Sequence, residues 1–167
     1  MVKDLAIEIG LATEADLDSI LDLQTANQLR NGGLLTANLP RAKIAEMMNG
    51  MPLVVARRNS DVVGFLMSAT REMYTDVPVI QAMLETYPGS SSAYVYGPIC
   101  VGEQARRQGL AQAMFAALTD QLTGREGILF IRRDNIVSIR AHSKMGVRLV
   151  GDFMFNGVEH AVFAYVG

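Results

Sequence analysis

The stretch "YVYGPICVGEQARRQGLAQAMFAALTDQL", residues 94–122, limits the possible folds of this chain more than any other segment. An apolar run typical of a buried strand leads through a short basic turn into a segment whose apolar residues Leu110, Met114 and Leu118 recur at helical spacing. A strand that passes directly into an amphipathic helix predicts a mixed α/β fold. Gly109 lies in the first turn of that helix, where a glycine lowers the stability of the helix. A glycine at this position therefore needs an explanation other than helix formation.

The rest of the chain supplies further strands and helices. Alternating and β-branched apolar runs predict strands over residues 5–11, 52–58, 62–69, 93–101, 127–133, 147–155 and 158–166. Helical spacing predicts helices over residues 12–28, 40–50, 110–122 and 135–146, with a shorter helix that begins near Pro78. We therefore expect one mixed α/β sheet with flanking helices.

Local capping and turn residues mark the ends of several predicted elements. Thr13 and Asp16 form a capping box at the start of the first helix. Asn135 is placed to cap the last helix, and Gly146 is placed to end it. The Asn-Gly dipeptide at 156–157 predicts a two-residue hairpin turn of type I′.

Length and composition exclude several classes of protein. Residues 1–167 suggest a single domain with an insertion at 70–92, and a hydrophobic share of 50% excludes a disordered chain. A net charge of -2 gives no footprint for nucleic acid, and no apolar run approaches the ~18 residues of a membrane helix. The single cysteine, Cys100, excludes an intramolecular disulfide, and the N-terminus lacks the apolar region of a signal peptide. We expect a cytoplasmic protein without nucleic-acid or membrane partners.

The turn "RRQGLA", residues 106–111, has the chemistry of an anion site. The first N–H groups of a helix are unpaired and carry the positive end of its dipole, and a glycine lets a ligand approach the backbone. Arg106 and Arg107 add positive charge, which we favour over the alternative of two solvated loop arginines. Neither a Walker loop nor the pattern G-x-G-x-x-G is present, which disfavours a nucleotide-binding regulator.

Arg106, Gly109 and Ala111 form the pattern R-x-x-G-x-A, which resembles motif A of the GNAT N-acetyltransferase superfamily, Q/R-x-x-G-x-G/A. The segment "NIVSIRAHSKMGV", residues 135–147, resembles the next segment of that family at the right distance, although Val147 stands where an aromatic residue is usual. The order of elements matches as well. The resemblance, to small bacterial-type GNAT acetyltransferases, implies a central, mostly antiparallel sheet with splayed middle strands and about four to five helices.

The resemblance also implies acetyl-CoA as co-substrate, without a metal, and a pyrophosphate held by the backbone amides of the turn. The pair at 97–98, Gly-Pro, supports this independently, because a proline in a central strand removes a ladder hydrogen bond and marks a break where pantetheine would pair with the strand. The cofactor-binding residues that the resemblance implies are Ile99, Cys100, Val101, Arg106, Arg107, Gln108, Gly109, Leu110, Ala111, Gln112, Asn135, Ser138 and His142.

A few side chains are candidates for proton transfer. His142 stands where many GNAT enzymes have a tyrosine that protonates the departing thiolate, and an imidazolium would donate that proton. The equally weighted alternative is a helix-face histidine that only packs against the cofactor. Glu72, Tyr96 and Tyr94 are candidate bases for the amine, beside a water-mediated route, and each is more often structural. Cys100 is expected to be a small buried hydrophobe and no nucleophile.

We therefore predict an N-acetyltransferase that moves an acetyl group from acetyl-CoA directly to a primary amine of a small molecule, peptide or protein. A non-catalytic acyl-CoA sensor of the same fold is the alternative. The insertion, on the substrate side, carries Glu72, Asp76 and Glu85 against Arg71, which favours a cationic amine, although solvated surface charge explains these acids nearly as well. A homodimer is an expectation from the resemblance alone.

Overall fold

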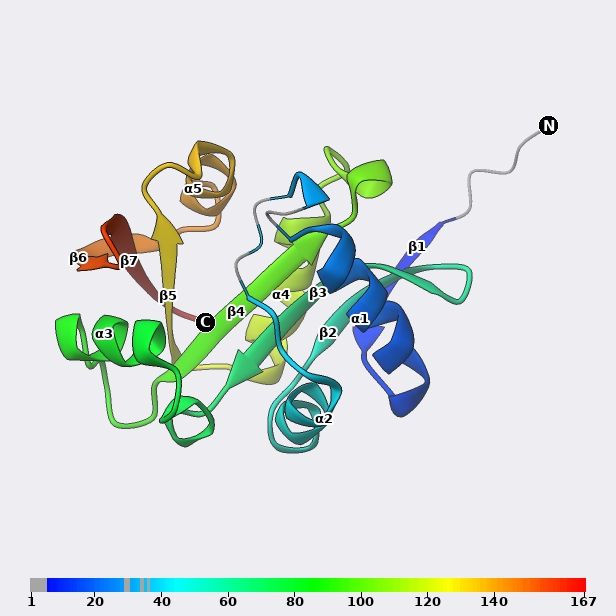
Figure 1. The fold of residues 1–167 in the computed structure, drawn as a ribbon. Helices are drawn as coiled ribbons and strands as arrows, with labels where there is room; N and C mark the ends of the chain where they lie inside the picture. Colours follow the sequence, from blue (N-terminus) through cyan, green and yellow to red (C-terminus); the bar gives the residue numbers. More distant parts are fainter. Residues whose placement is uncertain (1–5, 29–30, 34, 36) are drawn as a thin grey trace. The chain divides into compact units, whose positions relative to one another are not determined.

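The computed structural model describes residues 6–28, 31–33, 35 and 37–167. Within these residues the strands are β1 (Ile7–Leu11), β2 (Val54–Arg58), β3 (Asp61–Ala69), β4 (Tyr94–Val101), β5 (Glu126–Arg132), β6 (Arg148–Phe155) and β7 (Val158–Val166) (Figure 1). The α-helices are α1 (Leu17–Ala26), α2 (Arg41–Gly50), α3 (Pro78–Thr86), α4 (Leu110–Gln121) and α5 (Ile136–Ser143). Short 3-10 helices are η1 (Glu14–Asp16), η3 (Arg71–Tyr74) and η4 (Glu103–Ala105). The predicted order of elements is confirmed.

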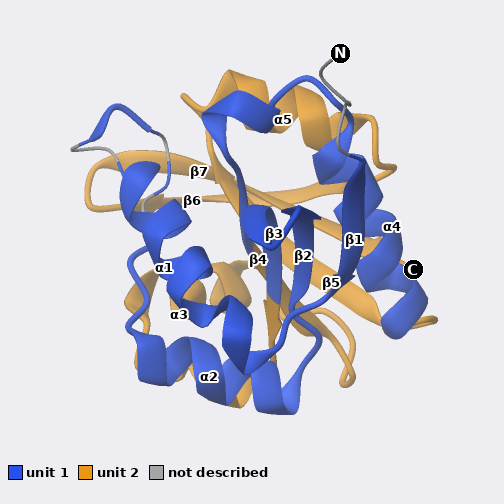
Figure 2. Ribbon diagram, turned by 90° about the vertical axis from the view of Figure 1, so that its right-hand side faces the viewer, with its two compact units in different colours: residues 1–67, 98–121 blue, residues 68–97, 122–167 orange. Residues whose placement is uncertain are grey.

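The strands form a mixed sheet with the order β1-β2-β3-β4-β5-β7-β6. The pairs β1–β2, β2–β3, β5–β7 and β6–β7 are antiparallel, whereas β4 and β5 run parallel. The expectation of a mixed, mostly antiparallel sheet with about five helices is therefore confirmed. The chain divides into two compact units, residues 1–67 with 98–121 and residues 68–97 with 122–167 (Figure 2).

Unit 1, the first of these, is built on the antiparallel strands β1, β2 and β3 with the helices α1, α2 and α4. Helix α4 packs against β1 and β2, and α1 packs against α2. The helical stripe predicted from the sequence is buried, because Met114 and Leu118 are both fully shielded from solvent. The capping box is also present, since the backbone N–H of Thr13 donates to Asp16 at 2.8 Å. Arg57 on β2 makes an ion pair with the same carboxylate, which ties the start of the helical segment to the sheet.

Unit 2 is built on the antiparallel strands β5, β7 and β6, with α3 packed against β6. The turn between β6 and β7 is the predicted type I′ turn, because Asn156 and Gly157 have φ angles of 50° and 75°. Helix α3 belongs to the insertion 70–92. Hydrogen bonds to the buried carboxylate of Glu126 connect this insertion to β5. That carboxylate accepts hydrogen bonds from the Tyr87 hydroxyl at 2.8 Å and the Ser90 backbone N–H at 2.7 Å.

The parallel pairing of β4 with β5 ends early. It covers the two residue pairs Tyr94 with Gly127 and Val95 with Ile128. The next glycine on β4, Gly97, has a φ of 104°, a conformation that side-chain-bearing residues rarely adopt, and Pro98 follows it. The strand itself continues to Val101, so the break that the Gly-Pro dipeptide predicted is confined to the pairing with β5, which ends at Val95.

No helix within the described part of the chain combines the length and the apolar character that crossing a membrane requires.

Candidate functional site

The basic turn lies in unit 1 between η4 and α4, and its backbone conformation is unusual. Arg107 and Gly109 both have positive φ angles, of 64° and 72°. A glycine is favoured at 109 for that reason alone, whereas a positive φ at an arginine is uncommon and costs free energy. A Cβ built on Gly109 would meet no protein atom within 4 Å. The backbone in front of the helix is thus open to an approaching ligand.

The first turn of α4 supplies hydrogen-bond donors at this opening. The backbone N–H of Ala113 donates to the carbonyl oxygen of Gly109 at 3.0 Å, which begins the intrahelical series. The N–H groups of Leu110, Ala111 and Gln112 precede that series and have no carbonyl one helical turn before them. They carry the positive end of the helix dipole, so this turn has the donors and the polarity of an anion site.

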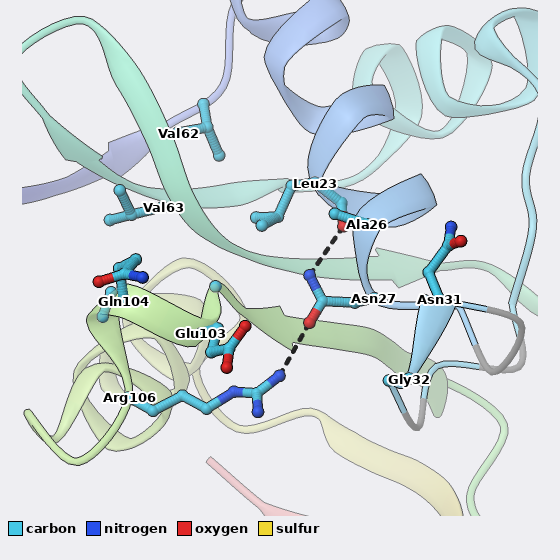
Figure 3. Close-up of a pocket in the computed structure, with 13 residues that line it drawn as sticks. Leu23, Ala26, Asn27, Asn31, Gly32, Val62, Val63, Glu103, Gln104 and Arg106 are labelled. Atoms are coloured by element: carbon cyan, nitrogen blue, oxygen red, sulfur yellow. Dashed lines mark hydrogen bonds between the residues drawn. The ribbon is translucent and has the colours of Figure 1, made fainter.

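The side chain of Arg106 is exposed, but two hydrogen bonds hold it against the protein. Its Nη2 donates to Oδ1 of Asn27 at 2.9 Å (Figure 3). Its Nε donates to the carbonyl oxygen of Val101 at 3.3 Å. Asn27 in turn donates from Nδ2 to the carbonyl oxygen of Leu23 in α1 at 2.9 Å. Arg106 therefore holds the turn against the end of α1. Arg107 is exposed as well, but no partner for its side chain occurs among the described residues.

A pocket of about 520 Å³ lies beside Arg106 within unit 1 (Figure 3). It lies among the end of α1, the turn that follows it, the start of β3 and the η4 segment. Its lining residues are Leu23, Ala26, Asn27, Asn31, Gly32, Gly33, Val62, Val63, Gly102, Glu103, Gln104, Ala105 and Arg106. The role of Asn27 was not visible in the sequence, because its partner lies 79 positions away in the chain.

In unit 2, Tyr96 on β4 and His142 on α5 form a buried polar pair. The Tyr96 hydroxyl lies 2.9 Å from Nε2 of His142, and the two rings meet edge to face with centroids 5.5 Å apart. The exposed fractions are 5% for Tyr96 and 3% for His142, so bulk water does not compete for this bond. The sequence named both residues as candidates, and the fold brings them together.

The hydrogen bonds around His142 fix its tautomer. Nδ1 lies 2.8 Å from the carbonyl oxygen of Ser138, and because a carbonyl only accepts, Nδ1 must carry the proton. The other ring nitrogen of the neutral imidazole, Nε2, then accepts from the Tyr96 hydroxyl. Asn135 supports this arrangement, since its side chain accepts from the Ser138 N–H at 3.2 Å and caps the helix as predicted.

Burial also sets the charge states of the pair. Desolvation lowers the pKa of His142 below its usual value of 6.5, although the carbonyl of Ser138 offsets part of that shift. Desolvation likewise raises the pKa of Tyr96 above the ordinary 10.0, with a smaller contribution from nearby Tyr94. At neutral pH the imidazole is therefore neutral, and the proton shared between the two side chains belongs to the phenol.

Several other candidates have surroundings that suit a structural role. Cys100 is 7% exposed, and burial raises the pKa of its thiol to about 12, which disfavours a thiolate nucleophile. The Tyr94 hydroxyl is bonded to the hydroxyl of Tyr165, a partner that the sequence did not reveal. Glu72 is exposed in η3, and no partner for its carboxylate occurs among the described residues.

The carboxylates of the insertion all face solvent. Asp76 and Glu85 are exposed like Glu72, whereas Arg71 donates to the carbonyl oxygen of Ser90 and is partly buried. Within the residues that the structure describes, no group of histidine, cysteine, aspartate and glutamate side chains is arranged to hold a metal ion.

Comparisons with known proteins agree with these features. The family model described as "Acetyltransferase (GNAT) family" matches residues 19–147, while no curated protein matches the sequence. A phosphinothricin acetyltransferase (Pat) from Sinorhizobium meliloti, solved in complex with AcCoA, is 20% identical with a TM-score of 0.69, covering 95% of this chain and 87% of that chain. The putative acetyltransferase yncA from Salmonella typhimurium, solved with its cofactor acetyl-CoA, is 14% identical with a TM-score of 0.72, covering 96% and 94%.

A plant structure is similar to the same extent. Arabidopsis thaliana NAA60, solved in complex with a bisubstrate analogue, is 17% identical with a TM-score of 0.70, covering 96% of this chain and 97% of that chain. At these identities the three structures show a shared fold over nearly the whole chain.

Proposed function

The chain belongs to the acetyltransferase (GNAT) family, and we propose that it transfers an acetyl group from acetyl-CoA directly to a primary amine. The amine nitrogen attacks the thioester carbonyl, and the thiol of coenzyme A departs. Holding both reactants in line supplies much of the rate, and a backbone N–H near Cys100 on β4 stabilises the oxyanion.

The observation that carries this proposal is the turn before α4. Arg107 and Gly109 hold left-handed backbone conformations there, and the space in front of Gly109 is free of protein atoms. The turn thus presents unpaired N–H groups and a helix dipole to a ligand that can come close to the backbone. A pyrophosphate, with its several negative oxygens, fits these donors. The acetyl-CoA bound in the Sinorhizobium and Salmonella structures supports the same assignment.

The remaining cofactor assignments follow the family pattern. Ile99, Cys100 and Val101, beyond the break in β4, offer strand backbone to the pantetheine amides. Asn135 and Ser138, at the start of α5, are assigned to the cofactor in addition to their roles in the helix cap.

We further propose that the insertion contributes to acceptor selection. Its exposed carboxylates Glu72, Asp76 and Glu85 suit a cationic amine, while Arg71 is occupied by a backbone carbonyl. The bisubstrate analogue bound by NAA60 supports an amine-bearing acceptor in general. A cytoplasmic location is an expectation from the sequence, a homodimer is an expectation from the resemblance, and both stay predictions.

The test is calorimetric titration of the purified protein with acetyl-CoA, using glycine variants that differ only in position. Gly109→Glu places a carboxylate in front of the helix, and binding in the micromolar range should be lost. Gly124→Glu is the matched control, because Gly124 has a similar φ of 78° and a Cβ there also meets no protein atom within 4 Å. This control should bind as the parent does, since both changes carry the same backbone strain and charge.

Two results would argue against the proposal. If both variants bound acetyl-CoA with equal affinity, the turn would not be part of the cofactor site. If the parent protein did not bind acetyl-CoA, the proposed function would be wrong. Binding without turnover over a broad amine panel would instead favour the acyl-CoA sensor.

A further inference from the structure

We propose that the pocket of about 520 Å³ in unit 1 binds an apolar amino acid, free or within a short peptide, as a zwitterion, and that its occupancy strengthens acetyl-CoA binding. The pocket is distinct from the anion site in front of α4, because none of the residues 107–112 lines it. Binding of the zwitterion goes beyond the proposed function, whereas its effect on acetyl-CoA rests on that function.

Arg106 brings a positive charge to the wall of the pocket. Its Nε and Nη2 donate to the carbonyl oxygen of Val101 and to Oδ1 of Asn27, which hold the guanidinium in place. A guanidinium has five N–H donors in all, and no partner for Nη1 of Arg106 occurs among the described residues. A ligand carboxylate at Nη1 would form charge-assisted hydrogen bonds.

Glu103 supplies the opposite charge. It is exposed in η4, and the described part of the chain contains no partner for its carboxylate. Glu103 and Arg106 both line the pocket, yet they form no ion pair with each other. A simple anion would be repelled by Glu103 and a simple cation by Arg106, so the two charges together favour a ligand that carries both.

The rest of the lining suits an apolar ligand body. Its aliphatic residues come from α1 and the start of β3, and they are Leu23, Ala26, Val62 and Val63 (Figure 3). The volume of about 520 Å³ lies within the range of small-molecule sites. An amino acid with an aliphatic side chain combines this apolar surface with the carboxylate and the ammonium group that the two charges require.

Close backbone contacts form the pocket before any ligand binds. A Cβ on Gly33 would lie 1.9 Å from the carbonyl oxygen of Asn27, so the turn after α1 approaches the helix as only a glycine permits. A Cβ on Gly102 would lie 3.2 Å from Cδ1 of Leu23, which brings the start of the η4 segment equally close to α1. A preformed site loses less conformational freedom when a ligand binds.

Arg106 connects the pocket to the turn before α4. It is the first residue of "RRQGLA", and its side chain is bonded to the pocket residue Asn27. A carboxylate bound at Nη1 would restrain the guanidinium further, and a more restrained turn loses less conformational entropy when it binds a pyrophosphate. Because such coupling is reciprocal, acetyl-CoA must strengthen zwitterion binding by the same factor.

The first test is calorimetric titration of the purified protein with L-leucine and with L-leucyl-L-leucine, without acetyl-CoA. The two zwitterions distinguish a free amino acid from a peptide. Isoamylamine, which lacks the carboxylate of leucine, and isocaproate, which lacks its amine, are the controls. We expect saturable binding of at least one zwitterion and about tenfold weaker binding of both controls. No binding by either zwitterion, or equal binding of a control, would overturn the inference and leave the proposed function untouched.

Variants locate the bound zwitterion in the pocket. Ala26→Leu fills the pocket from an exposed position on α1 and should weaken zwitterion binding about tenfold. Thr25→Leu, at the neighbouring exposed position that does not line the pocket, is the matched control and should bind as the parent does. Glu103→Gln should weaken binding about threefold, and Arg106→Gln about tenfold. Urea unfolding verifies that each variant is folded. Equal affinities of Ala26→Leu and Thr25→Leu would overturn the assignment to this pocket.

The second test measures the coupling. The Kd for acetyl-CoA should fall about fivefold when the zwitterion is present at saturation, and Ala26→Leu should bind acetyl-CoA without responding to it. An unchanged or higher Kd in the parent protein would overturn the inference, as would conversion of the zwitterion to an N-acetylated product, detected by mass spectrometry. If the parent protein did not bind acetyl-CoA, the proposed function and the coupling would both be wrong, whereas zwitterion binding in the first test would still establish the ligand of the pocket.

Discussion

Nη2 of Arg106 lies 2.9 Å from Oδ1 of Asn27, so the first residue of the R-x-x-G-x-A pattern is bonded to the end of α1. The two residues are 79 positions apart, and their hydrogen bond connects the turn before α4 to the end of α1. The motif arginine therefore supports the conformation of the turn, while Arg107 presents its charge to solvent.

Replacing Arg107 should weaken cofactor binding, whereas replacing Arg106 should destabilise the fold. Arg107→Gln should weaken acetyl-CoA binding about fivefold at low salt and less at about 0.5 M salt, because screening already removes most of that attraction. Arg106→Gln should instead lower the free energy of unfolding by about 1 kcal/mol, as should Asn27→Ala. Calorimetry and urea unfolding check the two effects.

The double variant of Arg106 and Asn27 decides whether these two act as a pair. Its loss of stability should be smaller than the sum of the single losses, because both changes remove the same bond. Additive losses would contradict the assignment.

The ion pair of Asp16 with Arg57 should dominate the acid stability of unit 1. Asp16 is 5% exposed, and the guanidinium of Arg57 lowers the pKa of its carboxyl below 3.8. A lowered pKa stabilises the fold above pH 3.8, and that stability is lost as the pH falls through the folded value. Asp16→Asn should cost about 3 kcal/mol at pH 7 and flatten the acid limb of the unfolding free energy.

Asp18 provides the control for that experiment. It pairs with Arg41, but its side chain is 85% exposed, so Asp18→Asn should change stability by less than about 0.5 kcal/mol. Equal losses from both variants, measured by urea unfolding between pH 3 and pH 7, would show that burial is not the cause.

The carboxylates of the insertion should govern acceptor affinity. Glu72→Gln combined with Asp76→Asn should raise the KM for a cationic amine several-fold, with little change in kcat, because only ground-state attraction is lost. Glu46→Gln combined with Asp22→Asn, which changes two exposed carboxylates on α2 and α1, is the control for net charge. An unchanged KM in the double variant would show that these carboxylates are solvated surface charges with no role in acceptor binding.

Cys100 should be inert in the folded protein. A thiol whose pKa is about 12 contains almost no thiolate at pH 7.5, so iodoacetamide should label it only after unfolding. Cys100→Ala should retain transfer activity, because the proposed route passes through no enzyme-bound acyl group. Rapid labelling of the native protein together with loss of activity would restore the nucleophile hypothesis.

The order of elements and many of their ends were predictable from the sequence. Thr13 with Asp16, Asn135, Gly146 and the Asn-Gly turn at 156–157 each behave as predicted. These features depend on a residue's own φ preference or on a partner three or four positions away, so the local sequence contains the necessary information.

The side-chain pairs from which residue roles are inferred could be identified only in the tertiary structure. Tyr96 and His142 are 46 positions apart, and Asp16 and Arg57 are 41 apart. Each residue was visible in the sequence, but nothing in the chain between the partners specifies which strand register or helix face brings them together.

The sequence by itself thus determined that a strand, a basic turn with Gly109 and a helix form one unit, because propensity, capping and backbone conformation act over a few residues. Only the tertiary structure decided that Arg106 bonds Asn27 and that Tyr96 donates to a neutral His142. Hydrogen-bond direction and pKa depend on burial and on the partners that folding supplies from distant parts of the chain.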